Sequence, residues 1–429
     1  MITFEKCSSL QGNIKVPADK SMTHRAIILA SMADGVSVIN NPLISRDTEA
    51  TINIMQELGV NIANERSRLL ISSEGYHKFK EPYGVLNCDN SGTTARLCLG
   101  VLAPMKFFSS VAGDPSLHRR PMDRIINPLR KMGANIFGKK ENTLLPACVV
   151  PANMHGATIE AEHKSAQVKS GVLLAAAQIE GETTYTEKTL TRDHTEKMMP
   201  LFGVDIESKD GVTKIKGGKP LNQAQLTIPA DFSSAAFYIG AGMIFDNSDI
   251  VIENCGLNPT RTGLLTALEH LGVKIETEIT DTTYEQVGTI RVKPAKIKGG
   301  RIDGDLVANM IDEVPILAML GLFGESPLEI RDAKELRVKE SDRIAALVNN
   351  FKALGANIEE FEDGLKIYPL EKEPEKATLL AFDDHRISMV NIILAKKFGI
   401  KVLLDNVIAI EVSYPHFIGD LLTLEVKEK

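Results

Sequence analysis

The sequence predicts an α/β chain of two domains, each built from three copies of one small unit. An apolar helix rich in Ala, Leu and Ile recurs six times, each time opened by a polar stretch and followed by a β-type run. A second, amphipathic helix that closes on Gly alternates with it. The 429 residues also exceed what one small core supports, because domains hold about 150 residues.

Each unit combines one helix that is apolar on nearly every side, which predicts burial, with one surface helix and several strands. The six apolar segments begin at Lys20, Ser91, Ser165, Asp231, Asp312 and Asp383. The surface helices are expected to end in left-handed residues at Gly59, Gly133, Gly203, Gly272 and Gly355. A boundary between Arg192 and Asp231 separates the third unit from the fourth.

Composition excludes several classes of function. A net charge of −7 and the absence of Trp disfavour a nucleic-acid binder with a broadly basic surface or a base-stacking platform. The chain has neither a P-loop nor a GxGxxG fingerprint, so nucleotide binding of those kinds is not expected. Five scattered cysteines without a zinc spacing, no signal-like start and no long apolar run indicate a cytoplasmic protein that does not insert into membranes.

The segment DKSMTHR places Lys20 and Arg25 where a buried helix begins. The partial positive charge of a helix N-terminus disfavours nearby cations, unless an anionic ligand binds there. If the apolar helices of a domain lie parallel, their N-termini gather at one anion-binding end. The alternative is that Asp19 or Ser21 caps the helix while both cations reach into water.

Other helix starts carry similar groups. In SGTTARL, Gly92 lets a ligand approach the backbone, and Arg96 lies in the first turn. The arginines Arg119, Arg120 and Arg124 surround a Pro turn, although such a run is also typical of a solvated face. Motifs SAQ and TRDHTEKM add hydroxyl, amide and guanidinium groups, for which capping is the alternative interpretation.

The segment ELRVKESDRIAAL crowds Lys339, Glu340 and Arg343 together. Lys339 and Arg343 are four residues apart, so on one helix they would repel unless an anion lay between them. Glu340 is alternatively an ordinary surface residue that pairs with a neighbour. The motif DDHRISM suggests no metal triad, because its adjacent acids tend to point apart.

Taken in order along the chain, these motifs resemble those of the 5-enolpyruvylshikimate-3-phosphate synthase family: VPADKSMTHRA, NSGTTAR, GDPSLHRRPM, SAQ, TRDHTE, IDEVPILA, LRVKESDRIAAL and DDHRISM. The resemblance implies a two-domain inside-out α/β barrel of six βαβαββ-type repeats. It implies an N-terminal domain of residues 13–230, a C-terminal domain of residues 231–429 plus 1–12, and an active site in the cleft between them.

The resemblance further implies that the enolpyruvyl group of phosphoenolpyruvate moves to the 5-hydroxyl of shikimate 3-phosphate, with release of phosphate and no metal or organic cofactor. The implied contacts to shikimate 3-phosphate are Lys20, Ser21, Arg25, Ser165, Ala166, Gln167, Arg192, Asp312 and Lys339. Those to phosphoenolpyruvate are Lys20, Gly92, Arg120, Gln167, Arg343 and Arg386. No nucleic-acid or membrane partner is expected, and the chain is expected to be a monomer.

The implied reaction needs a base and an acid on different atoms, because the 5-hydroxyl loses a proton while C3 of phosphoenolpyruvate gains one. Asp312 is the candidate for the hydroxyl proton and Glu340 for the C3 proton. Lys20 is expected to share this work, since neighbouring cations lower the pKa of a lysine.

The sequence departs from the family pattern at several positions. Ala18 replaces a more usual Gly, Ala166 a frequent Ser, and Glu335 an Asn found in some members. Glu411 and Val412 stand where some members carry a Lys, and no role is assigned to either.

Two alternative functions stay open. One is the related transferase that acts on UDP-N-acetylglucosamine, whose family has a KN pair in the first motif and uses a loop cysteine as acid. This chain has KS in that motif and no matching loop motif around its cysteines. A non-catalytic anion-binding protein gains nothing from acids among its cations, so Asp312 and Glu340 argue against it.

Overall fold

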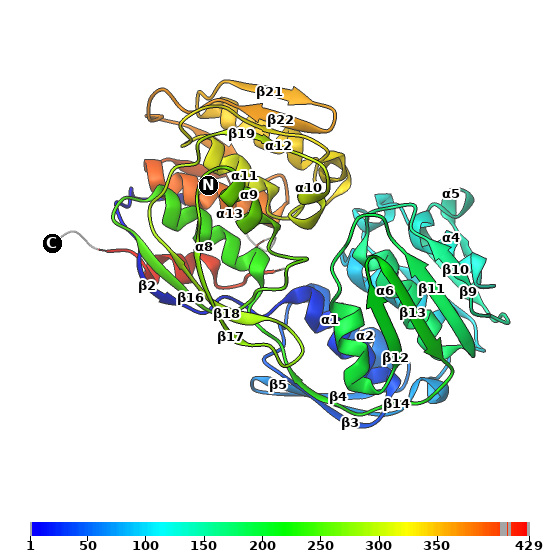
Figure 1. Cartoon of the computed structure of the whole chain (residues 1–429). Coiled ribbons are helices and arrows are strands. Elements are labelled where there is room, and N and C mark those ends of the chain that lie inside the picture. The colour runs from blue at the N-terminus through cyan, green and yellow to red at the C-terminus, as the bar shows by residue number, and fades with distance from the viewer. Residues whose placement is uncertain (1, 404–409, 411–412, 427–429) are drawn as a thin grey trace. The chain divides into compact units, whose positions relative to one another are not determined.

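The computed structural model describes residues 2–403, 410 and 413–426 (Figure 1). Glu411 and Val412 lie outside the described residues. Packing divides the chain into two compact units. We call Ala18–Ile228 the central unit and Met1–Pro17 together with Pro229–Lys429 the terminal unit.

The central unit contains three repeats with the same element order. The first consists of α1 (Lys20–Met32), β3 (Ala33–Asn40), α2 (Arg46–Glu57), β4 (Asn61–Glu65), β5 (Arg68–Glu74) and the short η1 (Tyr76–Lys78). The second consists of β6 (Leu86–Asn87), α3 (Gly92–Leu102), β7 (Ser109–Ala112), η2 (Leu117–Arg119), α4 (Asp123–Lys131), β8 (Asn135–Gly138), α5 (Lys139–Asn142) and β9 (Leu144–Val150). The third consists of β10 (Thr158–Glu160), α6 (Ala166–Gln178), β11 (Gly181–Thr186), α7 (His194–Met198), η3 (Met199–Phe202), β12 (Asp205–Lys209) and β13 (Val212–Gly217).

The terminal unit repeats this order. Its first repeat consists of β2 (Gln11–Ile14), α8 (Phe232–Ile244), β16 (Asp249–Gly256), α9 (Gly263–His270), β17 (Glu276–Asp281) and β18 (Val287–Val292). Its second consists of β19 (Gly300–Ile302), α10 (Asp305–Asn309), α11 (Val314–Gly321), β20 (Leu328–Ile330), η4 (Lys334–Val338), α12 (Arg343–Ala353), β21 (Ile358–Phe361) and β22 (Gly364–Ile367). Its third contains β23 (Thr378–Leu380), α13 (His385–Phe398), β24 (Lys401–Leu403), α15 (Phe417–Thr423) and β1 (Ile2–Thr3).

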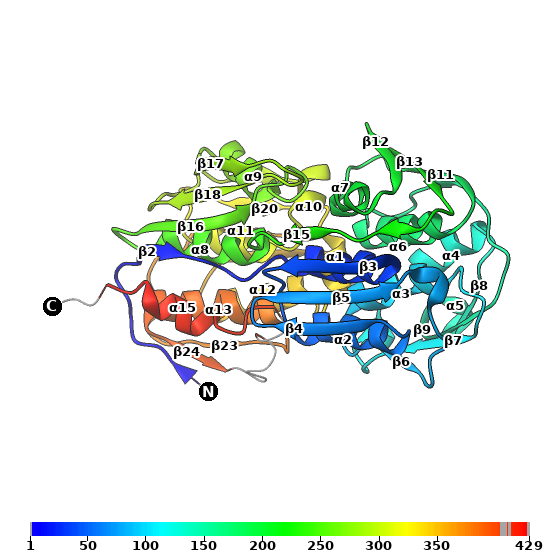
Figure 2. The same cartoon turned by 90° about the horizontal axis from the view of Figure 1, so that it is seen from below.

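The described strands form six small sheets, one for each repeat. In each sheet an opening strand pairs in parallel with the strand that follows the buried helix. Five of the sheets then continue with two antiparallel strands, as β3, β5 and β4 do side by side in Figure 2, and in the sixth β1 pairs antiparallel with β24. A parallel pair requires a crossover, and in four of the sheets the segment with the apolar helix supplies it. The predicted α/β fold of six repeats is therefore confirmed.

Each unit takes the opening strand of its first repeat from a distant part of the chain. In the central unit, β14 (Leu221–Asn222) and β15 (Gln225–Thr227) pair in parallel with β3. In the terminal unit, β2 pairs in parallel with β16. These exchanges explain why the chain passes from one unit to the other twice, after Pro17 and after Ile228.

The apolar helices form the cores, as predicted. All residues of α8 and α13 are buried, and α1 is buried from Met22 to Met32. Helices α3 and α6 meet at two glycines, since a Cβ on Gly100 would lie 2.1 Å from the carbonyl oxygen of Gly171. Only Gly permits so close an approach of two backbones.

The surface helices end as predicted. Positive φ values occur at Gly59, Gly133, Gly203, Gly272 and Gly355, between 77° and 97°. These glycines allow each helix to stop and turn into the next strand without the steric cost that a Cβ would add. Among the described residues, no helix combines the length and apolarity needed to cross a membrane.

Candidate active site

The buried helices of the central unit begin with side-chain caps. The Met22 N–H donates to Asp19 Oδ1 over 2.8 Å at the start of α1. Ser91 caps α3 by accepting from the Thr94 N–H over 3.1 Å, and Ser165 caps α6. Because Asp19 rather than Ser21 caps α1, the Ser21 hydroxyl is left to accept a hydrogen bond from Arg192 Nη1 over 3.4 Å.

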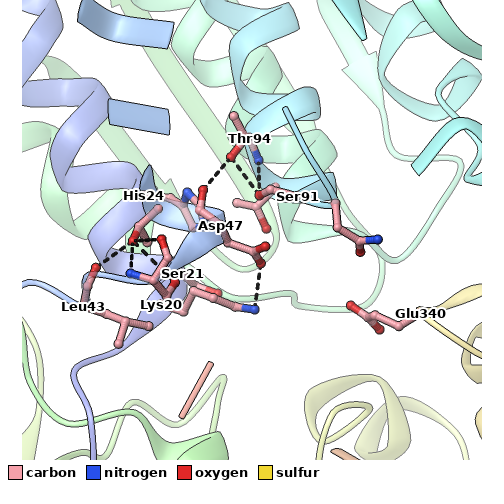
Figure 3. Close-up of polar contacts among 12 residues, drawn as sticks. Lys20, Ser21, His24, Leu43, Asp47, Ser91, Thr94 and Glu340 are labelled. Atoms are coloured by element: carbon pink, nitrogen blue, oxygen red, sulfur yellow. Dashed lines mark hydrogen bonds and ion pairs between the residues drawn. The ribbon is translucent and has the colours of Figure 1, made fainter. Parts of the chain in front are cut away.

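The alternative interpretation was right that Asp19 caps α1, but it was wrong that both cations reach into water. The Lys20 ammonium lies 2.9 Å from Asp47 Oδ2, and its side chain is 17% exposed (Figure 3). Arg25 is 2% exposed and donates to Thr195 Oγ1, Ser170 Oγ and the Ser21 carbonyl oxygen over 2.7–2.9 Å. Both cations are therefore fixed inside the protein at the start of α1.

A chain of buried hydroxyls connects the starts of three helices. His24 Nδ1 lies 2.7 Å from Thr51 Oγ1, which lies 2.7 Å from Thr94 Oγ1. Thr94 Oγ1 in turn lies 2.7 Å from Ser91 Oγ and 3.2 Å from the Asp47 carbonyl oxygen (Figure 3). Burial lowers the pKa of His24 well below its usual value, as do Lys20 and Arg25, so its ring is neutral. These hydrogen bonds hold Asp47, the partner of Lys20, beside Ser91, the cap of α3.

Two guanidinium groups lie beside Gly92. A Cβ at this position would lie 3.1 Å from Arg96 Nη1, which is a tight contact, and 3.4 Å from Arg120 Nη1, which is an ordinary contact distance. Arg96 donates to Gln167 Oε1 over 2.5 Å, which joins α3 to α6.

The run of arginines divides between solvent and interior. Arg119 is exposed, whereas Arg120 is 9% exposed and donates to the Asn90 side-chain oxygen. The solvated-face interpretation therefore holds for Arg119 and is wrong for Arg120.

The N-termini of α1, α3 and α6 thus gather in one place, as expected. Arg25 and Ser170 join α1 to α6, Arg96 and Gln167 join α3 to α6, and the hydroxyl chain joins α1 to α3. We define the central cluster as Lys20, Ser21, Arg25, Asp47, Gly92, Arg96, Arg120, Ser165, Ala166, Gln167 and Arg192. The cluster thus brings five cations to three helix N-termini, a combination that favours the binding of an anion.

The terminal unit surrounds one carboxylate with cations. Asp312 Oδ1 lies 3.8 Å from Lys339 Nζ and 3.6 Å from Arg343 Nη1. Its Oδ2 lies 3.9 Å from Arg386 Nη2. These distances exceed the roughly 2.7–2.9 Å of a charge-assisted hydrogen bond. The Asp312 carboxylate thus lies in the field of three cations, and its backbone carbonyl oxygen accepts a hydrogen bond from Arg386 Nη1 over 3.2 Å.

The expectation that Lys339 and Arg343 share a helical face is wrong. The η4 turn ends at Val338, Lys339 is extended, and α12 begins only at Arg343. The physical reason is the cap, because Asp342 Oδ1 accepts from the Ala345 N–H over 3.0 Å and fixes the helix start there. The anion expected between the two cations is Asp312 of the protein itself.

Arg343 is the most enclosed cation of this group. Its side chain is 1% exposed, with Nε 2.8 Å from Asp384 Oδ2 and Nη2 2.6 Å from Glu340 Oε2. Burial acts to raise the pKa of Asp384, but the fields around it, led by Arg343, outweigh burial and hold that pKa below its usual value. Glu340 therefore does pair with a neighbour, as the alternative interpretation proposed.

Burial lowers the pKa of Lys339 from its usual value, against the opposing fields of Asp312 and Glu335. Asp383 is exposed while Asp384 is buried, so the adjacent acids of DDHRISM point apart as predicted. We define the terminal cluster as Asp312, Lys339, Glu340, Arg343, Asp384 and Arg386. Its three acids and three cations can hold an anion and exchange a proton with it.

Sequence reasoning missed several residues that the structure brings into these clusters. Asp47, Asn90 and Thr51 were not singled out, and Asp384 received no role. Asp47 follows Ser45 at the start of α2, where an acid is ordinary helix-dipole chemistry, so the sequence around it offers no sign of a partner on α1.

The chain matches known proteins over nearly its whole length. A family model described as EPSP synthase (3-phosphoshikimate 1-carboxyvinyltransferase) matches residues 4–421. Two curated proteins named 3-phosphoshikimate 1-carboxyvinyltransferase are each 40% identical to it. The protein from Bacillus subtilis aligns over 99% of both chains, and the one from Aquifex aeolicus over 98% of this chain and 99% of its own.

Solved structures agree. An EPSP synthase from Acinetobacter baumannii superimposes with a TM-score of 0.86 at 32% identity, covering 99% of this chain and 98% of that one. The enolpyruvyl transferase NikO from Streptomyces tendae shares the fold, with a TM-score of 0.77 at 16% identity over 99% of this chain and 96% of that one.

Proposed function

This chain belongs to the EPSP synthase family, and from that premise we propose that its two clusters divide one reaction between them. The activity is that of a 3-phosphoshikimate 1-carboxyvinyltransferase of the shikimate pathway of aromatic amino-acid biosynthesis. It transfers the enolpyruvyl group of phosphoenolpyruvate to the 5-hydroxyl of shikimate 3-phosphate and releases phosphate. The roles of the individual residues below are proposals.

Most of the central cluster binds the acceptor. The phosphate of shikimate 3-phosphate carries about −1.5 to −2 charges and seeks N–H and O–H donors. Ser21, Ser165, Ala166 and Gln167 lie at helix N-termini, so they offer backbone and side-chain donors in one direction. Arg192 adds charge from the loop before α7. Arg25 contributes its positive charge to the phosphate site while its N–H groups donate to three oxygens of the protein.

Phosphoenolpyruvate is held by Lys20, Gly92, Arg120 and Gln167 of the central cluster and by Arg343 and Arg386 of the terminal cluster. Guanidinium groups bind phosphate and carboxylate oxygens in pairs, which fixes orientation as well as charge. Gly92 matters for its lack of a side chain, since a Cβ there would crowd Arg96 and lie in contact with Arg120.

The terminal cluster carries most of the proton chemistry. Asp312 accepts the proton of the 5-hydroxyl as that oxygen bonds to C2, while Glu340 delivers a proton to C3. Loss of phosphate from C2 and of a proton from C3 then restores the double bond. Lys20 assists as a second acid and base, and Lys339 holds the acceptor beside Asp312. We assign no step to a metal or organic cofactor.

The observation that carries this assignment is the position of Asp312. Its oxygens lie 3.6–3.9 Å from Lys339, Arg343 and Arg386, near enough to share their field. The cations proposed to hold the two substrates thus surround the carboxylate that is proposed as the base. We further propose a monomer acting in the cytoplasm, because all proposed contacts come from one chain and its five cysteines are free thiols.

The test is phosphate release from phosphoenolpyruvate with either acceptor. We expect release with shikimate 3-phosphate and none above background with UDP-N-acetylglucosamine. Release with the sugar nucleotide alone would favour the related transferase. Binding of shikimate 3-phosphate without any release would favour a non-catalytic anion-binding protein. Adding glyphosate, which competes with phosphoenolpyruvate in this family, measures the sensitivity of the site beside Gly92.

A further inference from the structure

Lys169 is a buried cation to which the proposed mechanism assigns no role. It lies on α6 one turn after Ser165, with a side chain that is 1% exposed. Its ammonium lies 2.6 Å from Glu187 Oε1 and 2.7 Å from Glu196 Oε1. Lys is almost never fully buried unless it is paired, so this arrangement needs a reason.

Lys169 and its two acids bracket the segment between β11 and α7. Glu187 follows β11 directly, and Glu196 lies on α7. Within the segment, the Thr191 carbonyl oxygen accepts from Lys169 Nζ over 3.3 Å, and the Thr191 hydroxyl donates to Glu187 Oε2 over 2.6 Å. Both the backbone and the side chain of Thr191 are therefore fixed, and the next residue is Arg192.

The far side of the same segment is fixed by the central cluster. Thr195 Oγ1 accepts from Arg25 Nε over 2.8 Å and lies 2.7 Å from Ser170 Oγ. Arg192 lies between these two anchors, where its guanidinium donates to Ser21 Oγ. Because Lys169 and Ser170 are neighbours on α6, one helix turn sets the position of both ends of the loop.

Stability alone does not account for this network. Two carboxylates face one ammonium, and burial raises the pKa of Glu196 even against the attraction of Lys169. Buried ion networks are often no more stabilising than apolar residues of similar volume, and their best-attested benefit is that they specify one conformation. The conformation specified here is that of the loop that presents Arg192.

We propose that Lys169 is a positioning residue for the acceptor: by holding Thr191 it keeps the Arg192 guanidinium beside Ser21, in place for the phosphate of shikimate 3-phosphate. The inference rests on the proposed function, because it takes Arg192 to be a ligand of that phosphate. Lys169 itself does not touch the substrate.

The test is a double-mutant cycle of Lys169→Met and Arg192→Ala, with shikimate 3-phosphate binding measured by calorimetry and turnover by phosphate release. Loss of a charge-assisted hydrogen bond weakens binding by about tenfold or more. We expect each single variant to raise the Kd for shikimate 3-phosphate about tenfold and to leave the KM for phosphoenolpyruvate within about twofold. The double variant should bind no more weakly than Arg192→Ala, because both changes act through one guanidinium.

Two further variants separate positioning from a general loss of stability. Thr191→Val removes the hydroxyl that donates to Glu187 without deleting a charge, so it tests the same link if Lys169→Met does not fold. We expect it to raise the Kd about threefold. The matched control is Gln178→Leu, a buried polar residue at the other end of α6 that bonds Val101 and Leu174. It should lower stability and leave the Kd unchanged.

The outcomes distinguish two failures. Unchanged binding in Arg192→Ala refutes the proposed role of Arg192, and the inference falls with it. If Arg192→Ala weakens binding while Lys169→Met and Thr191→Val do not, the inference alone is overturned. It is equally overturned if the losses in the double variant add, or if Gln178→Leu weakens binding as much as Lys169→Met does.

Discussion

The central and terminal clusters differ in the balance between their cations and their carboxylates. The central cluster gathers five cations, Lys20, Arg25, Arg96, Arg120 and Arg192, with one carboxylate, Asp47, and a second carboxylate, Asp19, caps α1 beside it. The terminal cluster matches three cations, Lys339, Arg343 and Arg386, with three acids, Asp312, Glu340 and Asp384. One cluster thus keeps an excess of positive charge, whereas the other neutralises its own.

The partners of the cations differ in kind as well. In the central cluster, hydroxyls, amides and backbone carbonyls hold Arg25 and Arg96. In the terminal cluster, carboxylates hold Arg343. Neutral partners fix a guanidinium without cancelling its charge, which suits the binding of a phosphate. Carboxylates cancel the charge but supply groups that can exchange protons, which suits acid and base chemistry.

The largest loss of stability is expected when a buried acid of the terminal cluster is replaced. Asp384→Asn removes the carboxylate that Arg343 needs in a site where both side chains are at most 1% exposed. Removing one partner of a buried ion pair costs about 3–5 kcal/mol, and because Arg343 keeps Glu340 we expect the free energy of unfolding in urea to fall by about 3 kcal/mol. Exposed Asp383→Asn is the matched control and should change it by less than about 0.5 kcal/mol. A loss below about 1 kcal/mol for Asp384→Asn would contradict the view that these charges depend on each other.

The corresponding change in the central cluster should cost less. Asp47→Asn leaves Lys20 without its carboxylate, but the side chains of this pair are 17% and 12% exposed, so water can replace part of the lost contact. We expect a loss of about 1–2 kcal/mol in the same urea measurement. Exposed Glu49→Gln, on the same helix, is the control. A loss as large as that of Asp384→Asn would remove the distinction between the clusters.

The neutral hydroxyl chain of the central cluster predicts a pH dependence. The pKa of His24 lies well below its usual value in the folded state, so below about pH 6.5 the unfolded chain binds a proton that the folded chain does not. Stability should therefore fall as the pH drops from 6.5, by up to about 1.4 kcal/mol per pH unit from this residue.

Urea midpoints at pH 7.5, 6.5 and 5.5 measure this slope. His24→Gln should flatten it, while exposed His77→Gln should not. An unchanged slope in His24→Gln would mean that another group causes the acid sensitivity.

The smallest effect concerns salt. Because the central cluster holds more cations than carboxylates, raising KCl from about 50 to 500 mM should raise the KM for shikimate 3-phosphate about two- to fivefold. The terminal cluster is internally neutral and largely enclosed, so kcat should change less than twofold. Steady-state phosphate release at several salt concentrations measures both. A salt-dependent kcat with a constant KM would reverse the assignment.

The sequence was informative wherever a structure depends on neighbouring residues. The caps Asp19, Ser91 and Ser165 precede the helices that they start, and Gly59 or Gly355 directly follows the helix that it ends. Such features are local, because the hydrogen bonds or φ angles involve residues only a few positions apart. For this reason the six repeats could be predicted from the pattern alone.

The residues that were missed depend on distant parts of the chain. Asp47 is 27 residues from Lys20, and Asp384 is 41 residues from Arg343. Both acids are also favourable at a helix start, so each is explained by its own helix and the sequence gives no sign of its distant partner. The prediction that Lys339 lies on a helix with Arg343 was wrong for a related reason. It relied on the spacing of four residues and overlooked Asp342 as the cap that starts the helix at Arg343.

The division between an anion-binding cluster and a proton-transferring one is tested most directly with Glu340→Gln. Gln keeps the shape of Glu340 and a hydrogen-bonding oxygen for Arg343, but it carries no acidic proton. Phosphate release measured over full ranges of both substrates should show kcat reduced about 10²- to 10⁴-fold, with both KM values within about threefold. Arg192→Ala, by contrast, should mainly raise the KM for shikimate 3-phosphate. An unchanged kcat in Glu340→Gln, with a raised KM for phosphoenolpyruvate, would contradict the account.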